Sequence, residues 1–164
     1  MLNYQNKAAI NPDVPRRNPN ISISLPAAAF GGAMLITFFL LVSLLGFETA
    51  TGLRFLNFVL LIPVIIYSVR TYVNTMHQRS YLEAMRVSIL SFIGSYAILA
   101  LFMFFYLMVI NPAFMDYLNQ TVVPSTKLNP FGVFALLLGE GCVGAVILSY
   151  VVLQYYKDQL KRMA

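Results

Sequence analysis

The sequence predicts an all-α integral membrane protein, a bundle of four transmembrane helices with both termini in the cytoplasm. Hydrophobic residues make up 59% of the 164 residues and charged residues only 10%, far below the roughly 25% charge of a soluble domain. The apolar residues gather in four runs, each about 20 residues or longer, which is the length that crosses a bilayer. Four such spans with short connections leave no room for a separate soluble domain.

The first 25 residues are polar and rich in Asn and Pro, as in Asn11-Pro12 and Asn18-Pro19. This composition favours a flexible, solvated tail. The alternative is a peptide that docks on a partner. We therefore divide the chain into a flexible cytoplasmic tail, residues 1–25, and a four-helix transmembrane domain, residues 26–164.

The first two spans are predicted over residues 26–47 and 54–73. Pro26 suits a first helical turn, and Gly31 with Gly32 offers a neighbouring helix a site of close approach. Pro63 lies in the middle of the second span. It lacks an amide N–H and is expected to kink the helix. That kink is either a static feature or a hinge.

The third span is predicted over residues 81–110. Ser80 and Glu83 have the spacing of a capping box, in which the serine side chain caps the helix and the glutamate accepts from the serine N–H. Asn111-Pro112 ends the span. A short interfacial helix is predicted at Pro112–Leu118, with Phe114 facing lipid.

The fourth span is predicted over residues 130–160, with Asn129 capping its free amides. Its apolar run carries one acid, Glu140, about 15 Å from the start and so close to the bilayer midplane. A charged acid there costs at least about 2.5–3.5 kcal/mol. We expect Glu140 to be protonated, paired or facing water, with Tyr96 or Thr37, at similar estimated depth, as its hydrogen-bond partner.

Two roles for Glu140 stay open. It handles protons or cations, alone or in a partner's pathway, or it is a neutral polar link between helices. Gly139, Gly141 and Gly144 surround it. Small residues at this spacing predict a packing face, either within the bundle or toward a partner.

The basic residues give the orientation. Two of them fall on one side of the predicted spans, Arg54 and Lys127. The other nine fall on the opposite side, and cytoplasmic connections carry the excess of Lys and Arg. Both termini are therefore expected in the cytoplasm. The nine are Lys7, Arg16, Arg17, Arg70, Arg79, Arg86, Lys157, Lys161 and Arg162.

Catalytic signatures are missing from the sequence. It has no Gly-rich phosphate loop, HExxH, nucleophile elbow or CxxC, and it holds one His, one Cys and six acids. We expect neither an enzyme nor a metal or cofactor site. The net charge of +5 comes from the basic residues that flank the predicted spans. Nucleic acid is therefore not an expected partner. A membrane-embedded enzyme acting on lipid is the least favoured class.

Three segments resemble a known family. They are the basic turn Tyr67-Ser-Val-Arg70-Thr-Tyr72, the polar entry Ser80-Tyr-Leu-Glu-Ala84 and the exit Ile110-Asn-Pro-Ala-Phe114. Over about residues 26–160 the chain resembles the small four-helix membrane proteins of unknown function that are widespread in Bacteroidota. The resemblance implies a bacterial inner-membrane protein without an assigned activity. An acid in the fourth helix is not a feature of that family.

The leading functional hypothesis is an accessory, assembly or scaffold subunit of a larger membrane complex, because little of the chain lies outside the bilayer. Its expected partners are the lipid bilayer and other membrane subunits, or a second copy of itself. The alternative is a small transporter or proton-conducting element that uses Glu140.

Overall fold

The computed structural model describes residues 19–47, 52, 54–75, 80–121 and 128–161. Within these ranges every regular element is a helix, which confirms the predicted all-α class. The helices are α1 (Pro19–Leu44), α2 (Arg54–Thr75), α3 (Tyr81–Phe105), the π-helical turn η2 (Tyr106–Ile110), α4 (Ala113–Thr121) and α5 (Pro130–Lys161).

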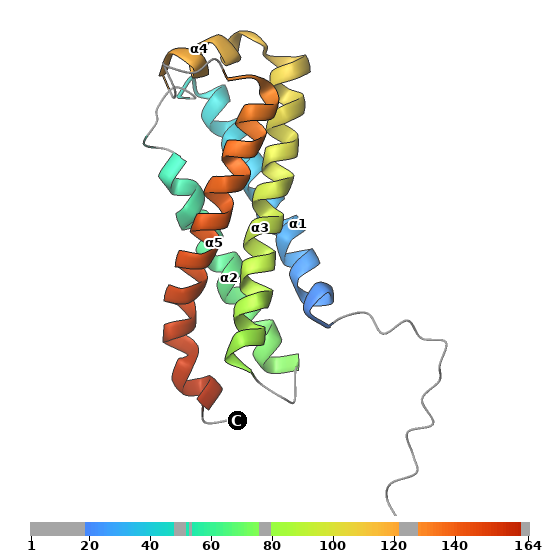
Figure 1. The fold of residues 1–164 in the computed structure, drawn as a ribbon, viewed down its shortest axis with the longest axis vertical. Coiled ribbons are helices and arrows are strands. Elements are labelled where there is room, and N and C mark those ends of the chain that lie inside the picture. Colours follow the sequence, from blue (N-terminus) through green and yellow to red (C-terminus); the bar gives the residue numbers. More distant parts are fainter. Residues whose placement is uncertain (1–18, 48–51, 53, 76–79, 122–127, 162–164) are drawn as a thin grey trace, which may run out of the picture.

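Four helices of the described chain are long and apolar enough to cross a membrane: α1, α2, α3 continued by η2, and α5. They alternate in direction, so the start of α1, the end of α2, the start of α3 and the end of α5 share one end of the bundle (Figure 1). We call this the terminal end. The opposite end, where α4 lies, is called the α4 end. The predicted four-span bundle is confirmed, and the cytoplasmic placement of the termini stays a prediction.

The outer surface of the bundle is apolar on all four long helices. A soluble bundle would carry polar residues on this face, whereas a helix in lipid is hydrophobic all round. The most exposed large apolar side chains include Phe30 and Leu41 on α1, Phe55 and Val59 on α2, Leu90 and Leu101 on α3, and Val143 and Val151 on α5.

Helix α1 begins earlier than predicted, at Pro19 rather than Pro26. Pro19 itself suits a first helical turn, and Ile23 and Ala27 are buried on the inward face, so the segment is held by packing. Residues 19–25 are therefore helical, which corrects the predicted boundary of the tail. The rest of that predicted tail, residues 1–18, lies outside the described residues.

Helix α1 also ends earlier than predicted, at Leu44 rather than residue 47. Gly46 has a φ of 75°, the left-handed conformation that glycine adopts without steric cost. The Phe47 amide donates to the Val42 carbonyl at 3.0 Å, and the Gly46 amide donates to the Ser43 carbonyl at 3.0 Å. These two bonds form a Schellman motif, which closes the helix.

The third span runs to Ile110 as predicted, but its last turn is π-helical. The Asn111 amide donates to the Tyr106 carbonyl, five residues earlier, at 2.9 Å. This wider turn carries the chain from α3 into α4 across the α4 end (Figure 1).

Helix α4 covers the α4 end of the bundle. Phe114 is buried, and its ring packs against that of Phe39 on α1, with the two ring centroids 6.5 Å apart. The prediction that Phe114 faces lipid is therefore wrong, because the inward side of this short amphipathic helix finds an apolar partner on α1. Asn119 holds the far end of α4 through two bonds to the Leu128 backbone, one accepted at 2.6 Å and one donated at 3.2 Å.

Helix α5 begins at Pro130, as predicted. The Asn129 side-chain oxygen accepts from the Gly132 amide at 2.7 Å, which confirms the predicted cap.

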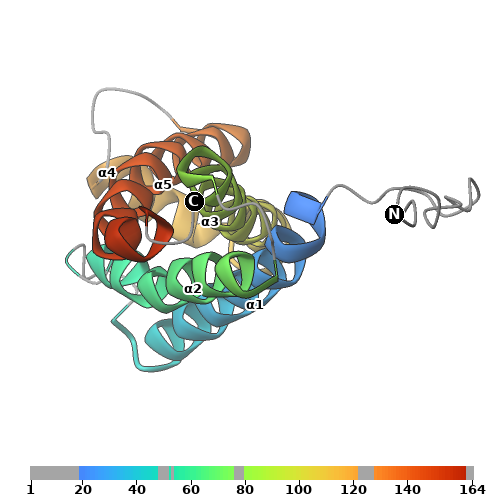
Figure 2. The ribbon, with the colours of Figure 1, turned by 90° about the horizontal axis from the view of Figure 1, so that it is seen from below.

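Helix α3 is the centre of the bundle. It packs against α1, α2 and α5 and lies between α1 and α5 (Figures 1 and 2). Glycines bring the helices close. A methyl group placed at Gly32 of α1 would lie 2.7 Å from the Ile98 side chain, and one at Gly94 of α3 would lie 2.6 Å from the Ala28 side chain. A methyl at Gly31 would collide with the Ser95 hydroxyl.

The α3–α5 contact is built in the same way. A methyl group placed at Gly141 would lie 2.6 Å from Cβ of Tyr96, and one at Gly144 would collide with the ring of Phe58. Gly139 differs from Gly141 and Gly144, since no atom of the described residues lies within 4 Å of a methyl placed there. Gly139 therefore packs against no other part of the described chain.

Gly141 and Gly139 form a matched pair for testing this packing. We expect Gly141→Val to destabilise the protein by about 1–3 kcal/mol, because the valine overpacks the α3–α5 contact. Gly139→Val has the same change in helix propensity but meets open space, so the isolated chain should keep its wild-type stability. Thermal unfolding in detergent, followed by far-ultraviolet circular dichroism, measures both. Equal effects of the two substitutions would contradict the packing described here.

Candidate functional site

Glu140 lies on α5 in a half-buried position between Gly139 and Gly141. Gly144, one helical turn further along, packs on Phe58 of α2, and residues four apart share a helix face. The edge of α5 that carries Glu140 therefore turns toward α2. Phe58 lies in the opening turns of α2, which begins at Arg54.

Tyr96 of α3 packs directly on Gly141, the residue after Glu140, so it lies at the same depth in the bundle as Glu140. The Tyr96 side chain has no exposed surface. Its ring stacks on Phe92 with centroids 5.2 Å apart and lies 5.9 Å from the ring of Phe58. The aromatic cluster of Phe58, Phe92 and Tyr96 fills the space between α2, α3 and α5. Tyr96 is thus close to the backbone of the Glu140 segment, as the estimated depth predicted.

Thr37 does not belong to this site. Its side chain is exposed, and its hydroxyl donates to the Ala33 carbonyl at 2.8 Å. Leu35, which has no exposed surface, marks the buried face of α1. Thr37 follows two residues later, about 200° further around the helix. The prediction that Thr37 partners Glu140 is therefore corrected. The two residues have similar estimated depths in the membrane, but Thr37 lies on the outward face of α1.

Pro63 lies on the outer surface of α2, inside an uninterrupted helix. The carbonyl that loses its usual helical donor belongs to Val59, whose side chain is also exposed. Neither residue faces the aromatic cluster. The choice between a static kink and a hinge at Pro63 stays a prediction.

Five serines inside the bundle form a polar group that the sequence analysis did not single out. All five have no exposed surface: Ser68 on α2, Ser88, Ser91 and Ser95 on α3, and Ser149 on α5. We call them the serine cluster. The signal was present in the sequence, because positions 88, 91 and 95 repeat at helical spacing on one face of the third span.

Hydrogen bonds connect several of these serines across helices. The Ser68 hydroxyl donates to the Ser91 hydroxyl at 2.9 Å, which links α2 to α3. The Ser95 hydroxyl lies 3.3 Å from the Ala28 carbonyl, which links α3 to α1. Ser95 lies at the level of the aromatic cluster, between Phe92 and Tyr96 along α3. The other members, Ser88, Ser91 with its partner Ser68, and Ser149, lie on the terminal-end side of that cluster. Within the described residues, the other buried polar side chain, Ser24, lies on this side too.

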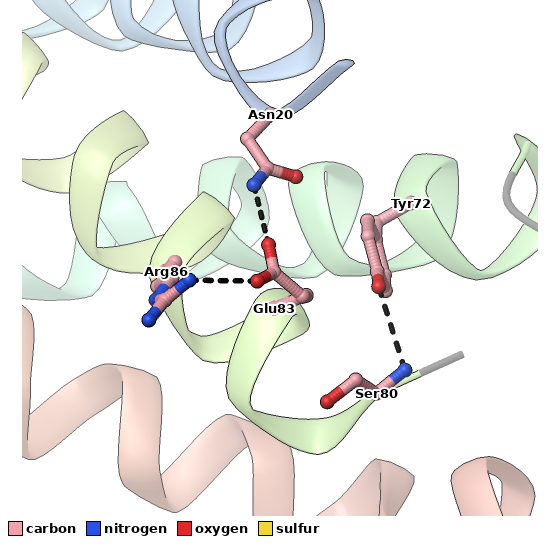
Figure 3. Close-up of polar contacts among 5 residues, drawn as sticks. All are labelled: Asn20, Tyr72, Ser80, Glu83 and Arg86. Carbon is pink, nitrogen blue, oxygen red and sulfur yellow. Dashed lines mark hydrogen bonds and ion pairs between the residues drawn. The ribbon is translucent and has the colours of Figure 1, made fainter. Parts of the chain in front are cut away.

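A second polar group lies at the terminal end, where α3 starts (Figure 3). The Glu83 carboxylate accepts from the Asn20 amide of α1 and from Arg86, the latter at 2.7 Å. The Ser80 amide donates to the Tyr72 hydroxyl of α2 at 3.4 Å. These contacts tie the first turn of α3 to both α1 and α2.

The predicted capping box is half right. Ser80 occupies the N-cap position in an extended conformation, and α3 starts at Tyr81 as expected, but Ser80 makes no side-chain capping bond. Glu83 does not reach back to the Ser80 amide, because its carboxylate binds Asn20 and Arg86 instead. Tertiary partners have replaced the local ones.

The described part of the chain holds no group of three His, Cys, Asp or Glu side chains able to bind a metal ion. Its cysteine, Cys142, is exposed on the outer face of α5. Comparison with known proteins adds no relative: no protein-family model, no curated protein and no solved structure matches the chain. The resemblance to the Bacteroidota family stays a prediction.

The link between α1 and α3 at the terminal end can be tested at Glu83. We expect Glu83→Ala to free the start of α1, because Asn20 loses its partner. The bond is partly exposed and worth about 1 kcal/mol, which is about fivefold in a local opening equilibrium. Hydrogen exchange at the amides of residues 23–25 measures this.

Tyr72→Phe is the matched control for Glu83→Ala. It removes the bond to the Ser80 amide and should loosen the start of α3 without affecting α1. Unchanged exchange in α1 after Glu83→Ala would show that packing alone holds this helix end.

Proposed function

We propose that the chain is an accessory, assembly or scaffold subunit of a larger complex in the bacterial inner membrane, and that it acts by packing against other membrane helices. Its resemblance to four-helix inner-membrane proteins and the excess of basic residues on one side of the predicted spans support this placement, with both termini in the cytoplasm. In this proposal the chain carries no catalytic site and needs no cofactor.

The observation that carries the proposal is the outward face of α5. Ala135, Gly139 and Cys142 are exposed on it and lie at helical spacing. A methyl group at Gly139 meets no atom within 4 Å, in contrast to the other glycines of the spans, which are covered. Small residues let a second helix approach closely in lipid. We name Ala135, Gly139 and Cys142 the small-residue face.

Glu140 lies at the border of this face, half-buried beside Gly139. A carboxyl group at the edge of a helix–helix contact in lipid fixes the register of that contact. The reason is that few positions on the partner helix can form a hydrogen bond with the carboxyl group. This combination of a small-residue face and one polar group at its edge suits recognition of another membrane helix.

Native mass measurement of the protein, extracted from its host in mild detergent, tests the proposal. We expect an assembly that contains other membrane subunits. The Gly139→Val variant should be expressed and folded yet released from that assembly. Val151→Leu, on another exposed part of α5, is the control and should stay bound. A wild-type protein that runs as a lone monomer, or a Gly139→Val variant that stays in the assembly, would contradict the proposal.

A small transporter or proton-conducting element is the second candidate. One observation favours it: Glu140 borders Gly141, which packs on the buried Tyr96 at the end of the serine cluster. Polar groups inside a membrane bundle often mark the path of an ion or proton.

Glu140→Gln separates the two candidates. Glutamine keeps the shape and the hydrogen-bonding capacity but cannot carry a proton. As an assembly subunit, the variant should show wild-type native mass and less than a twofold change in any activity of the complex. As a proton element, it should assemble normally but lose flux in proteoliposomes. Wild-type flux in the variant would exclude the second candidate.

A further inference from the structure

The contact between α2 and α5 is fixed by Gly144 and Phe58. A methyl group placed at Gly144 would collide with the Phe58 ring, so the two helices touch at this point. Both helices run from the α4 end to the terminal end and are therefore parallel (Figure 1). This one contact gives the relative depth of the two helices and also the faces that they turn toward each other.

The same contact places the first residue of α2 at the level of Glu140. Arg54 precedes Phe58 by four residues, and Glu140 precedes Gly144 by four. Residues four apart lie on one helix face, one above the other. Because the helices are parallel, both steps lead toward the α4 end, by about 6 Å each. Positions 54 and 140 therefore agree in depth and in helix face.

Helix α2 starts well inside the bundle rather than at its edge. Gly144 lies about 21 Å along α5 from Pro130, whereas Phe58 lies only about 6 Å along α2 from Arg54. The start of α2 is thus about 15 Å further from the α4 end than the start of α5, and Figure 1 shows the same offset. Charged groups at such depth are costly, and in membrane proteins they pair with one another.

Within the described helices, Arg54 is the one charged residue that shares the level of Glu140. The others belong to the two ends of the bundle, and two of these, Glu83 and Arg86, are already paired with each other. At the terminal end lie Arg70, Glu83, Arg86, Lys157, Asp158 and Lys161, and α4 carries Asp116.

We propose that Arg54 forms an ion pair with Glu140 inside the bundle and is the positioning residue for this acid. A guanidinium donates two parallel hydrogen bonds to a carboxylate, so the pair satisfies two groups that would each be costly alone at this depth. It joins α2 to α5 beside the aromatic cluster and holds the carboxyl group on the α2 side of the small-residue face. The pair is independent of the proposed function, because both residues belong to this chain.

Solid-state nuclear magnetic resonance in lipid bilayers measures the pair directly. With isotope-labelled arginine nitrogens and glutamate carboxyl carbons, dipolar recoupling detects each guanidinium that lies against a carboxylate. We expect two such signals in the wild type. One comes from Arg86 and Glu83, whose atoms lie 2.7 Å apart, and serves as the internal standard. The other comes from Arg54 and Glu140.

Variants assign the second signal. Glu140→Gln keeps the shape and the hydrogen-bonding capacity of the side chain, and it should remove the second signal alone. Arg54→Met should do the same, whereas Arg70→Met, on the same helix near the terminal end, is the control and should keep both signals. A wild-type spectrum with the standard alone, or a second signal that survives Glu140→Gln, would overturn the proposal.

Exchange of the two charges gives an independent readout. Arg54→Glu places two acids at this level and Glu140→Arg places two bases, so each should lower the Tm by about 5–10 °C. The combined variant restores an ion pair and should be more stable than either single variant, which two unrelated structural defects would not produce. Single variants that fail to fold while the combined variant folds would support the pair equally. A combined variant less stable than the better single variant would contradict it.

Discussion

Packing around α3 takes place without help from the hydrophobic effect, because lipid tails are as apolar as the side chains they would replace. The helices must therefore gain stability from close contact and from polar bonds. Gly32 and Gly94 let α1 approach α3, while Gly141 and Gly144 let α5 approach the aromatic cluster. Dispersion attraction between helix surfaces in such close contact adds many small contributions to stability. The order α1–α3–α5 depends on this constraint.

Much of the fold follows from the sequence, because length and hydrophobicity alone determine which segments span a bilayer. All four spans and the start of the third, at Tyr81, were predictable. Helix ends were less so. Proline at 26 suggested a helix start, but packing of Ile23 and Ala27 extends α1 to Pro19. The capping box failed for a related reason, since Glu83 has a better partner in Asn20 of a distant helix.

The candidate site was predictable only in part. Depth along the span correctly brought Tyr96 to the level of Glu140, but depth says nothing about which face of a helix a residue occupies. An apolar span has little amphipathic signal, so nothing in its pattern distinguishes the lipid side from the protein side. Thr37 was misplaced for that reason. The serines carry a better signal, because positions 88, 91 and 95 repeat at helical spacing and all turn out buried.

The same reasoning separates residues that the fold requires from residues that it does not. Inward glycines are required, since a side chain at Gly141 would collide with Tyr96. The lipid-facing surface needs only to be apolar, and large side chains such as Val143 and Ile147 satisfy that need best. A glycine at 139 adds nothing to lipid contact and lowers helix propensity, and an acid at 140 adds a cost. The described fold does not explain Gly139, so the small-residue face of α5, with Glu140 at its border, is where a function beyond folding is best sought.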